Sequence, residues 1–316
     1  MLDGFTLNPG DLDWTGLEAL GDCTVYDRTA PEDVIERAKD AGIVLTNKTV
    51  LDADILAKLP NLKYIGVMAT GYNVIDLAAA DKLAIPVTNV PLYATNSVVQ
   101  AVFAYILEFA QHVALHSESV HSGKWAASAD FSYCEAPLTE LDGLTLGIVG
   151  YGRIGRGVAQ VARAFGMNVL VYGPRPVATG DPDIKLSSLD ELLKNSDIVS
   201  LHCPLTDETK GLINKDSLAM MKQSAILINT GRGPLINDLD LVDALEKGII
   251  SGAALDVLTE EPPRSGNPLI GVKNCIITPH IAWATHAARS RLMQTVRGNV
   301  EAYINHEPVN VVNNPV

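Results

Sequence analysis

The sequence has few cysteines and no long hydrophobic run. Its cysteines, Cys23, Cys134, Cys203 and Cys275, lie far apart and form no CxxC pair, so neither a zinc site nor a disulfide framework is indicated, and we expect no metal. No apolar run reaches the roughly twenty residues that are needed to cross a bilayer. The first residues, MLDGFTLNPGD, are acidic and turn-rich, unlike a secretory signal. We therefore expect a cytoplasmic protein without a membrane partner.

The chain also lacks an excess of positive charge. Lys and Arg number 24 against 37 Asp and Glu, which gives a formal net charge of -13. A net negative charge of this size repels polyanions and argues against binding to nucleic acid or to an anionic membrane. A few local positive groups can still hold a small anion, because exposed charges beyond roughly 8 to 10 Å are largely screened at physiological salt.

Apolar runs alternate with amphipathic helical patterns in the first hundred residues. Strands are predicted at 23–27, 41–47, 62–70 and 85–90, and helices at 31–40, 52–59 and 76–83. This βαβ alternation predicts a parallel sheet that is covered on both faces. A first strand should precede Asp3, but only Met1 and Leu2 are available there, so we expect that the domain lacks its opening strand or that the start is shortened.

A second βαβ series follows a long helical stretch at 96–117 and a polar loop at 122–137. Its strands are predicted at 144–150, 168–173, 197–204, 225–230, 252–257 and 275–280, and one last helix at 284–307. The 316 residues are enough for two domains with separate cores. We predict an α/β protein with two doubly wound parallel-sheet domains, one formed by 1–96 and 285–316 and the other by 97–284, which is inserted into the first.

A glycine-rich loop joins the first strand and the first helix of the second series, in LGIVGYGRIGRG. Gly150 permits a tight turn, Gly152 lets the backbone approach a pyrophosphate, and Gly155 lets the helix pack close to the strand. The phosphate then rests on the free N–H groups of the helix start, where Arg153 and Ile154 stand. Strand, loop, helix and a second strand in this order predict a nicotinamide dinucleotide site.

The second strand ends in Gly173, where an Asp or Glu usually binds the adenosine ribose. Without that carboxylate nothing repels a 2′-phosphate, and Arg175 offers a positive partner for it. Two interpretations stay open: the segment only shapes a turn and NAD binds, or NADP(H) is accepted. We predict that NADP(H) is used at least comparably to NAD(H).

Charged residues follow three strands of the second half. Arg232 lies between Gly231 and Gly233, Glu261 belongs to an acidic turn, and His280 follows a strand and a proline. Taken singly, the arginine is equally consistent with a structural ion pair, and the histidine with a purely structural role. Reduction of a ketone, however, needs a cation for the substrate carboxylate, a proton donor and an anion that keeps the donor charged. Arg232, His280 and Glu261 meet those needs.

Several motifs together resemble the D-isomer-specific 2-hydroxyacid dehydrogenases, most of all the glycerate dehydrogenase (hydroxypyruvate reductase) branch: GIVGYGRIGRG, LHCPLTDETKGLIN, LINTGRGPLIN, AALDVLTEEPP and TPHIAWAT. The resemblance covers nearly the whole chain. It implies a Rossmann domain inserted into a flavodoxin-like substrate domain, a cleft between them, and usually a homodimer built on the nucleotide domains. The implied reaction uses NAD(P)H on a small 2-oxo acid, with hydroxypyruvate to D-glycerate first and glyoxylate second.

The resemblance also assigns catalytic roles. Arg232 is implied to hold the substrate's carboxylate and carbonyl oxygen. Glu261, directly before a proline, is implied to pair with His280, which as an imidazolium donates a proton to that carbonyl oxygen. Glu260 is the second candidate for the pairing carboxylate.

The resemblance also implies which residues contact the cofactor and the substrate. Asp256 is implied to receive the nicotinamide carboxamide, and the groove beside the cofactor to be formed by Cys203, Pro204, Thr230, Gly231 and His280.

In the first domain, the loop at Thr70 and Gly71 is implied to offer backbone N–H groups to the substrate carboxylate, although Tyr72 stands where the family more often has Asp. Trp283 is implied to form a wall that leaves room for a short, hydroxylated substrate. Lys48 is either a second cation at the cleft or an exposed surface lysine.

Two other functions compete with this hypothesis. Formate dehydrogenases share the implied architecture, but they pair their histidine with an amide, so Glu261 argues for hydroxy-acid chemistry. A nucleotide-sensing binding protein of the corepressor type also keeps the fold, and the Arg, Glu and His set does not exclude it. The acidic chain, however, shows no added recognition tail.

Overall fold

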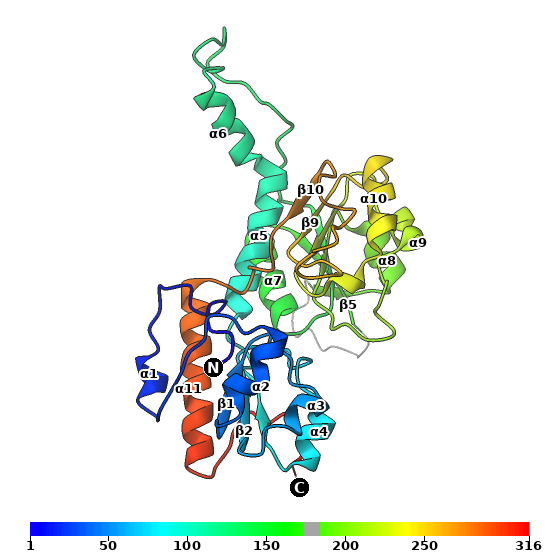
Figure 1. Cartoon of the computed structure of the whole chain (residues 1–316). Helices are drawn as coiled ribbons and strands as arrows, with labels where there is room; N and C mark the ends of the chain where they lie inside the picture. Colours follow the sequence, from blue (N-terminus) through cyan, green and yellow to red (C-terminus); the bar gives the residue numbers. More distant parts are fainter. Residues whose placement is uncertain (174–183, 316) are drawn as a thin grey trace. The chain divides into compact units, whose positions relative to one another are not determined.

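The computed structural model describes residues 1–173 and 184–315 (Figure 1). The chain divides into two compact units. Unit 1 consists of Met1–Ala94 and Trp283–Val316, and unit 2 is the continuous stretch Thr95–Ala282. One unit is therefore inserted into the chain of the other.

Unit 2 is built on a seven-stranded, wholly parallel sheet in the order β10-β9-β8-β7-β4-β5-β6. Its strands are β4 (Thr145–Val149), β5 (Asn168–Tyr172), β6 (Ile184–Leu186), β7 (Ile198–Leu201), β8 (Ile226–Asn229), β9 (Gly252–Leu255) and β10 (Cys275–Ile277). From β4 the chain first builds outward through β5 and β6, then returns to the other side of β4 with β7. This reversal is the feature of doubly wound sheets beside which nucleotides bind.

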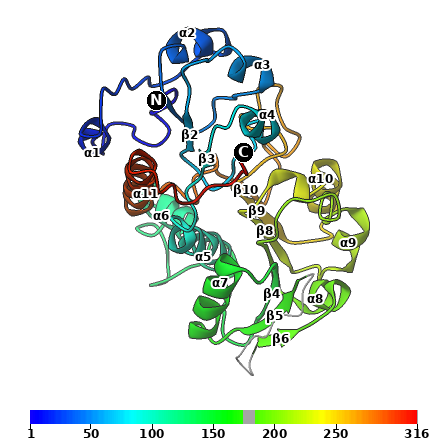
Figure 2. The ribbon, with the colours of Figure 1, turned by 90° about the horizontal axis from the view of Figure 1, so that it is seen from below.

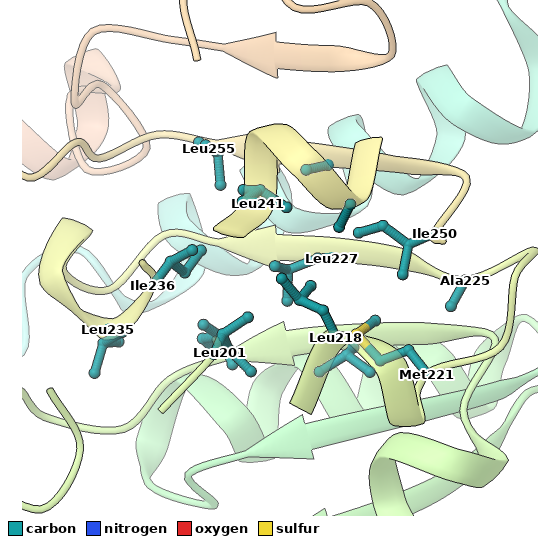
Figure 3. Close-up of a cluster of buried hydrophobic side chains, with 14 of the residues drawn as sticks. Leu201, Leu218, Met221, Ala225, Leu227, Leu235, Ile236, Leu241, Ile250 and Leu255 are labelled. Atoms are coloured by element: carbon teal, nitrogen blue, oxygen red, sulfur yellow. The ribbon is translucent and has the colours of Figure 1, made fainter. Parts of the chain in front are cut away.

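Helices cover both faces of that sheet (Figure 2). One face carries α5 (Thr95–Gln111) and α7 (Arg153–Ala164), and the other carries α8 (Leu189–Asn195), α9 (Lys215–Met220) and α10 (Asp238–Glu246). Neighbouring residues of one strand point to opposite faces: Leu227 packs among the side chains of α9 and α10, while Ile228 packs with those of α5 and α7. Figure 3 shows the first of these two cores around Leu227.

Unit 1 contains a smaller parallel sheet in the order β1-β2-β3. Its strands are β1 (Ile43–Thr46), β2 (Tyr64–Val67) and β3 (Val87–Thr88), and its helices are α1 (Thr15–Glu18), η1 (Pro31–Asp33), α2 (Val34–Ala38), α3 (Ala53–Leu56), α4 (Leu77–Lys82) and α11 (His286–Ile304). Both units thus show parallel strands joined through helices. The predicted α/β class is confirmed.

The N-terminal segment takes the place of an opening strand without forming a regular one. Leu2 N–H donates to Leu45 O of β1 (3.0 Å), while Gly4 N–H donates to Tyr26 O (2.8 Å) and Tyr26 N–H to Met1 O (3.0 Å). Residues 1–4 therefore lie between β1 and residues 24–27 but form no regular strand, so the described sheet lacks an opening strand, one of the two alternatives expected from the sequence. The predicted strand at 23–27 was wrong as a regular strand, because it is paired only by this irregular segment.

The long helix predicted at 96–117 is broken. α5 ends at Gln111, His112 has a positive φ of 47°, and α6 (Val113–His121) starts after it. No Gly or Pro marks this position in the sequence, which is why the helical pattern predicted continuity. In the described part of the chain no single helix is long and apolar enough to cross a membrane, and α5 and α6 satisfy length and composition only as a pair bent by 55°.

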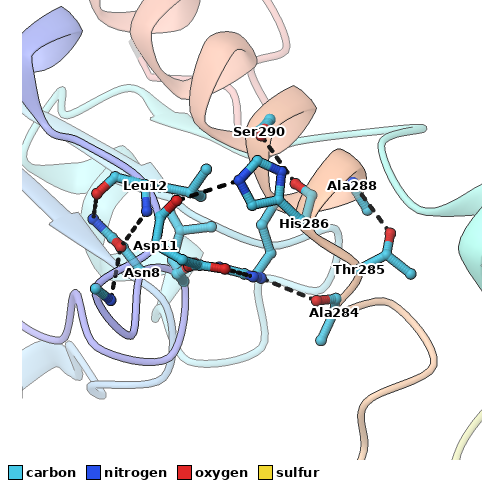
Figure 4. Close-up of polar contacts among 11 residues, drawn as sticks. Asn8, Asp11, Leu12, Ala284, Thr285, His286, Ala288 and Ser290 are labelled. Carbon is cyan, nitrogen blue, oxygen red and sulfur yellow. Dashed lines mark hydrogen bonds and ion pairs between the residues drawn. The ribbon is translucent and has the colours of Figure 1, made fainter.

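An arginine on α11 fastens the N-terminal loop of unit 1. The guanidinium of Arg289, which is 8% exposed, donates to both carboxylate oxygens of Asp11 (2.6 and 2.5 Å) and to the carbonyls of Leu7 (3.1 Å) and Ala284 (3.0 Å). Figure 4 shows Asp11 and Ala284 in this network, beside the start of α11. The hydrogen bonds from Arg289 hold the pKa of the Asp11 carboxyl below its ordinary value.

The core of unit 2 predicts the effect of removing one leucine. Leu227 on β8 is fully buried, so Leu227→Ala should lower the free energy of unfolding by about 2–5 kcal/mol through lost burial and a cavity. The matched control is Leu239→Ala in α10, where the side chain is 70% exposed and the change should stay within about 0.5 kcal/mol. Denaturant unfolding followed by circular dichroism measures both; equal losses would contradict the assignment of Leu227 to the core.

The Arg289–Asp11 pair predicts a loss of stability in acid. Because the folded protein lowers the pKa of Asp11, ionised Asp11 stabilises the fold above its ordinary pKa of 3.8, and this contribution is lost as the pH falls through the lowered value. Wild type should therefore be more stable than Asp11→Asn at neutral pH, and the two unfolding temperatures should converge as the pH falls below about 4. A gap that stays constant over this range would disprove the linkage.

Candidate active site

The glycine loop after β4 requires glycine at two positions for reasons internal to the fold. Gly150 has a φ of +99°, and a β-carbon there would lie 2.5 Å from the backbone nitrogen of Cys203. A β-carbon at Gly155 would lie 2.3 Å from Gly150 O. At Gly152, by contrast, a β-carbon would meet nothing within 4 Å. Packing therefore does not explain Gly152, and the open space is what close approach of a ligand to the backbone requires.

The start of α7 offers hydrogen-bond donors to an anion. Gly152 is its N-cap and gives it no side-chain cap, so the N–H groups of Arg153 and Ile154 have no partner among the described residues. With the helix dipole, such groups bind phosphate. Gly173 follows β5 and is half-buried, so no carboxylate stands at that strand end. Arg175 lies outside the described residues.

Arg232 stands on a loop that the strand before it holds in place. The buried Asn229 at the end of β8 donates to Arg232 O (2.8 Å) and accepts from Gly231 N (3.0 Å). The exposed guanidinium of Arg232 donates to Gly231 O (2.8 Å), and no carboxylate within the described ranges forms an ion pair with it. The interpretation as a structural ion pair therefore finds no support, and the positive charge is available to an anionic ligand.

The Arg232 loop packs directly on the acidic turn after β9. A β-carbon at Gly233 would lie 2.0 Å from the carbonyl of Leu258, so only glycine allows this approach. In that turn, Leu258 N–H donates to Oε1 of Glu261 (2.9 Å). The close packing at Gly233 thus brings the arginine loop and the glutamate turn together.

His280 and Glu261 form a hydrogen-bonded pair. Nδ1 of His280 lies 2.6 Å from Oε2 of Glu261, and each side chain is about one third exposed. With its other oxygen on Leu258 N–H, the Glu261 carboxylate is fixed at both ends. Glu260 is exposed and has no partner in the described structure, so of the two candidate carboxylates the structure pairs Glu261 with the histidine.

Asp256, at the end of β9, is only 1% exposed and lies under the His280 turn. Its carboxylate accepts from the backbone N–H groups of Ile281 and Ala282 (both 2.8 Å) and from the hydroxyl of Thr278 (2.7 Å). All of these contacts are to the chain itself. The implied contact with a nicotinamide carboxamide stays a prediction.

The ends of β7 and β8 carry the residues of the expected cofactor groove. Thr230 has a buried hydroxyl without a hydrogen-bond partner in the described ranges, a state that costs roughly 1–3 kcal/mol. Cys203 is buried, which raises the pKa of its thiol, and Pro204 beside it is exposed. The unpaired hydroxyl of Thr230 is the polar group here that a bound cofactor would satisfy.

The predicted substrate residues of unit 1 follow β2 and precede α11. The hydroxyl of Thr70 donates to Val90 O (2.9 Å), and Thr70 O accepts from the Asn89 side chain (2.8 Å). The backbone N–H groups of Thr70 and Gly71 make no hydrogen bond within the described structure.

Trp283 packs edge-on to Tyr93, with ring centroids 6.1 Å apart. Lys48 is exposed near the start of the loop after β1.

Sequence reasoning missed one residue near the histidine. Tyr105 of α5 lies 2.6 Å from the hydroxyl of Thr278, whereas the sequence indicated only a long helical stretch there. Its single polar atom carries no signal in a helix of apolar residues.

Comparison with known proteins places this chain in a family. The model for the NAD-binding domain of D-isomer specific 2-hydroxyacid dehydrogenases matches residues 103–282. The chain is 50% identical over 317 aligned residues to a hydroxypyruvate reductase of Blautia hydrogenotrophica, covering 99% of this chain and 98% of that protein. Among solved structures, it resembles the D-lactate dehydrogenase of Aquifex aeolicus complexed with NAD and lactic acid (TM-score 0.82, 32% identity, 96% and 95% of the two chains covered).

A second solved structure carries the other nicotinamide cofactor. It is an acyclic imino acid reductase in complex with NADPH and D-Arg, with a TM-score of 0.82, 31% identity, and 96% and 97% of the two chains covered. The family match spans most of unit 2, and the full-length similarity extends to unit 1. This chain belongs to the D-isomer-specific 2-hydroxyacid dehydrogenase family.

Proposed function

We propose that this protein uses NAD(P)H to reduce hydroxypyruvate to D-glycerate, and glyoxylate as a second substrate. The observation that carries the proposal is the Glu261–His280 pair at 2.6 Å, beside an arginine loop with no carboxylate partner in the described structure. Hydroxypyruvate leads because the relative that is 50% identical over nearly the full length is a hydroxypyruvate reductase.

We infer that the cofactor binds along the carboxyl-end edge of the unit 2 sheet. Gly150, Gly152 and the start of α7 would hold its pyrophosphate, and the Thr230 hydroxyl would gain a partner. Cys203, Pro204, Gly231 and Asp256 are proposed as further cofactor contacts. When bound, the reduced nicotinamide supplies the hydride that adds to C2 of the 2-oxo acid.

The chain's own groups handle the substrate's charge and the proton. The guanidinium of Arg232 grips the carboxylate and holds the carbonyl oxygen, as its planar fork of donors allows. Nδ1 of His280 faces the Glu261 carboxylate, so Nε2 is the nitrogen that delivers the proton to the nascent alkoxide. Glu261 stabilises the imidazolium before that transfer.

Unit 1 has its own proposed substrate residues. Thr70 and Gly71 offer backbone N–H groups that have no partner in the described structure and can donate to a carboxylate. Trp283, packed edge-on to Tyr93, is proposed to limit the size of the substrate. We also propose the predicted division into a substrate (catalytic) domain at 1–96 and 285–316 and a dinucleotide-binding domain at 97–284, with Arg232 and His280 of the second domain acting on the substrate as well.

We propose that NADP(H) is used at least comparably to NAD(H). No carboxylate stands at Gly173 to repel a 2′-phosphate. Related structures hold either cofactor, NADPH in the imino acid reductase and NAD in the D-lactate dehydrogenase. The role of Arg175 as the positive partner of the 2′-phosphate stays a prediction.

We further propose a homodimer formed through unit 2, in the cytoplasm. An apolar groove of about 550 Å³ is lined by Val99, Phe103 and Leu107 of α5 and Val161 of α7. α6 extends away from the sheet and exposes Val113 and other apolar side chains (Figure 1). Exposed apolar surface of this kind is typical of protein interfaces.

Absorbance of the reduced nicotinamide tests the function, with NADPH or NADH supplied for hydroxypyruvate, glyoxylate and pyruvate, and with NAD or NADP in the oxidised form supplied for formate. Hydroxypyruvate should give the highest kcat/KM, and NADPH should be used at least comparably to NADH. Turnover of none of the four would favour a nucleotide-sensing binding protein, and turnover of formate alone with NAD would favour a formate dehydrogenase. A several-hundredfold preference for NADH would refute the cofactor proposal only.

Substitution of the paired residues tests their roles. His280→Ala should lower kcat by about 10²- to 10⁴-fold, the usual contribution of a positioned proton donor, with little change in cofactor affinity. Glu261→Gln should also lose turnover, while Glu260→Gln serves as the matched control and should stay close to wild type. Steady-state kinetics and cofactor fluorescence measure the two effects. Near-normal turnover of His280→Ala would remove the histidine from the mechanism.

A further inference from the structure

The turn that carries His280 has an unusual backbone and needs an anchor. His280 has a φ of +54°, in the left-handed region that costs energy for a residue with a side chain. Its N–H donates to Asp256 O (2.8 Å), and the next two N–H groups, of Ile281 and Ala282, donate to the Asp256 carboxylate (both 2.8 Å). One buried carboxylate at the end of β9 therefore holds the backbone just after the histidine.

The carboxylate is in turn held by two hydroxyl groups. Thr278 donates to Oδ1 of Asp256 (2.7 Å), and Tyr105 lies 2.6 Å from the Thr278 hydroxyl and 3.4 Å from the same Oδ1. A carboxylate only accepts, so the Thr278 hydrogen points to Asp256 and its oxygen accepts from Tyr105. The result is a directed chain from Tyr105 through Thr278 to Asp256.

Tyr105 is suited to act as a permanent donor. It is 8% exposed, and burial raises its pKa to about 12, so the hydroxyl keeps its proton at neutral pH. It comes from α5, a 17-residue helix that packs against the sheet, whereas Asp256 and Thr278 follow β9 and β10. The chain therefore ties a long helix to the ends of two strands.

We propose that Tyr105 is a positioning residue for the reaction. Through Thr278 and Asp256 it fixes the backbone of residues 278–282, and this keeps the His280 imidazole in hydrogen-bonding position beside Glu261. This rests on the proposed function, because the reaction is where the position of His280 matters. Tyr105 itself forms no hydrogen bond with His280 or Glu261 in the described structure.

Tyr105→Phe removes one oxygen and keeps the ring. We expect kcat for hydroxypyruvate to fall about tenfold, since a lost hydrogen bond loosens a group that must be placed within a fraction of an ångström. The Kd for NADPH, measured by fluorescence without substrate, should stay within about twofold of wild type, because the variant leaves the glycine loop intact. Amide hydrogen exchange at Ile281 and Ala282 should become faster.

Tyr133→Phe is the matched control. It removes a tyrosine hydroxyl whose 2.7 Å contact is with Ser119 of α6, and it should change neither kcat nor the exchange rates. A second series of variants tests the hydrogen-bond chain from Tyr105 to Asp256. Thr278→Val should show the same loss of kcat, whereas Thr278→Ser, which keeps the hydroxyl, should retain activity. The double variant Tyr105→Phe/Thr278→Val should be no slower than Thr278→Val alone.

Three results would overturn the proposal: a kcat of Tyr105→Phe within twofold of an active wild type, losses that multiply in the double variant, or unchanged exchange at Ile281 and Ala282. If wild type turns over no 2-oxo acid, the proposed function fails instead, and the exchange rates of the two amides still decide whether Tyr105 positions the turn. Should Tyr105→Phe not fold, the Thr278→Val and Thr278→Ser pair tests the same chain.

Discussion

The site of unit 2 depends on one constraint, the parallel alignment of the sheet strands. Parallel neighbours need a crossover between them, and here helices α7 to α10 supply most of these crossovers on the two faces. These helices cover both faces of the sheet, and the carboxyl ends of the parallel strands all lie along one edge of it. The glycine loop after β4, the arginine loop after β8, Asp256 after β9 and His280 after β10 all lie at that edge.

Close backbone packing turns this shared edge into defined geometry. Asn229 shapes the Arg232 loop, the missing side chain of Gly233 lets that loop touch Leu258, and Leu258 N–H orients Glu261 toward His280. Each step is a backbone contact that a β-carbon or a lost hydrogen bond would change. The proposed catalytic residues are therefore placed by short turns on rigid strands, which is the arrangement that holds reacting groups most accurately.

The fold was predictable from the sequence where periodicity is strong and local. Buried strands such as β4 and β7 and the amphipathic α11 follow apolar patterns of the right period. The short β6 and the break at His112 were missed. β6 is three residues long, with two of them exposed, and the break rests on a positive φ that no Gly or Pro announces. The irregular pairing of the N-terminal segment was not predicted, because its partners at 24–27 and Leu45 are distant in the sequence.

Residue type and spacing by themselves determined that a nucleotide loop, a glycine-flanked arginine, an acidic turn and a histidine follow successive strands, because each is a local pattern. Only the tertiary structure decided that Glu261 rather than the adjacent Glu260 reaches His280, since neighbouring side chains leave a turn in different directions. It also decided that Asp256 holds the histidine turn and that Tyr105 supports Asp256 through Thr278. Those contacts join residues 22 to 173 positions apart, which only the packing of the folded chain brings together.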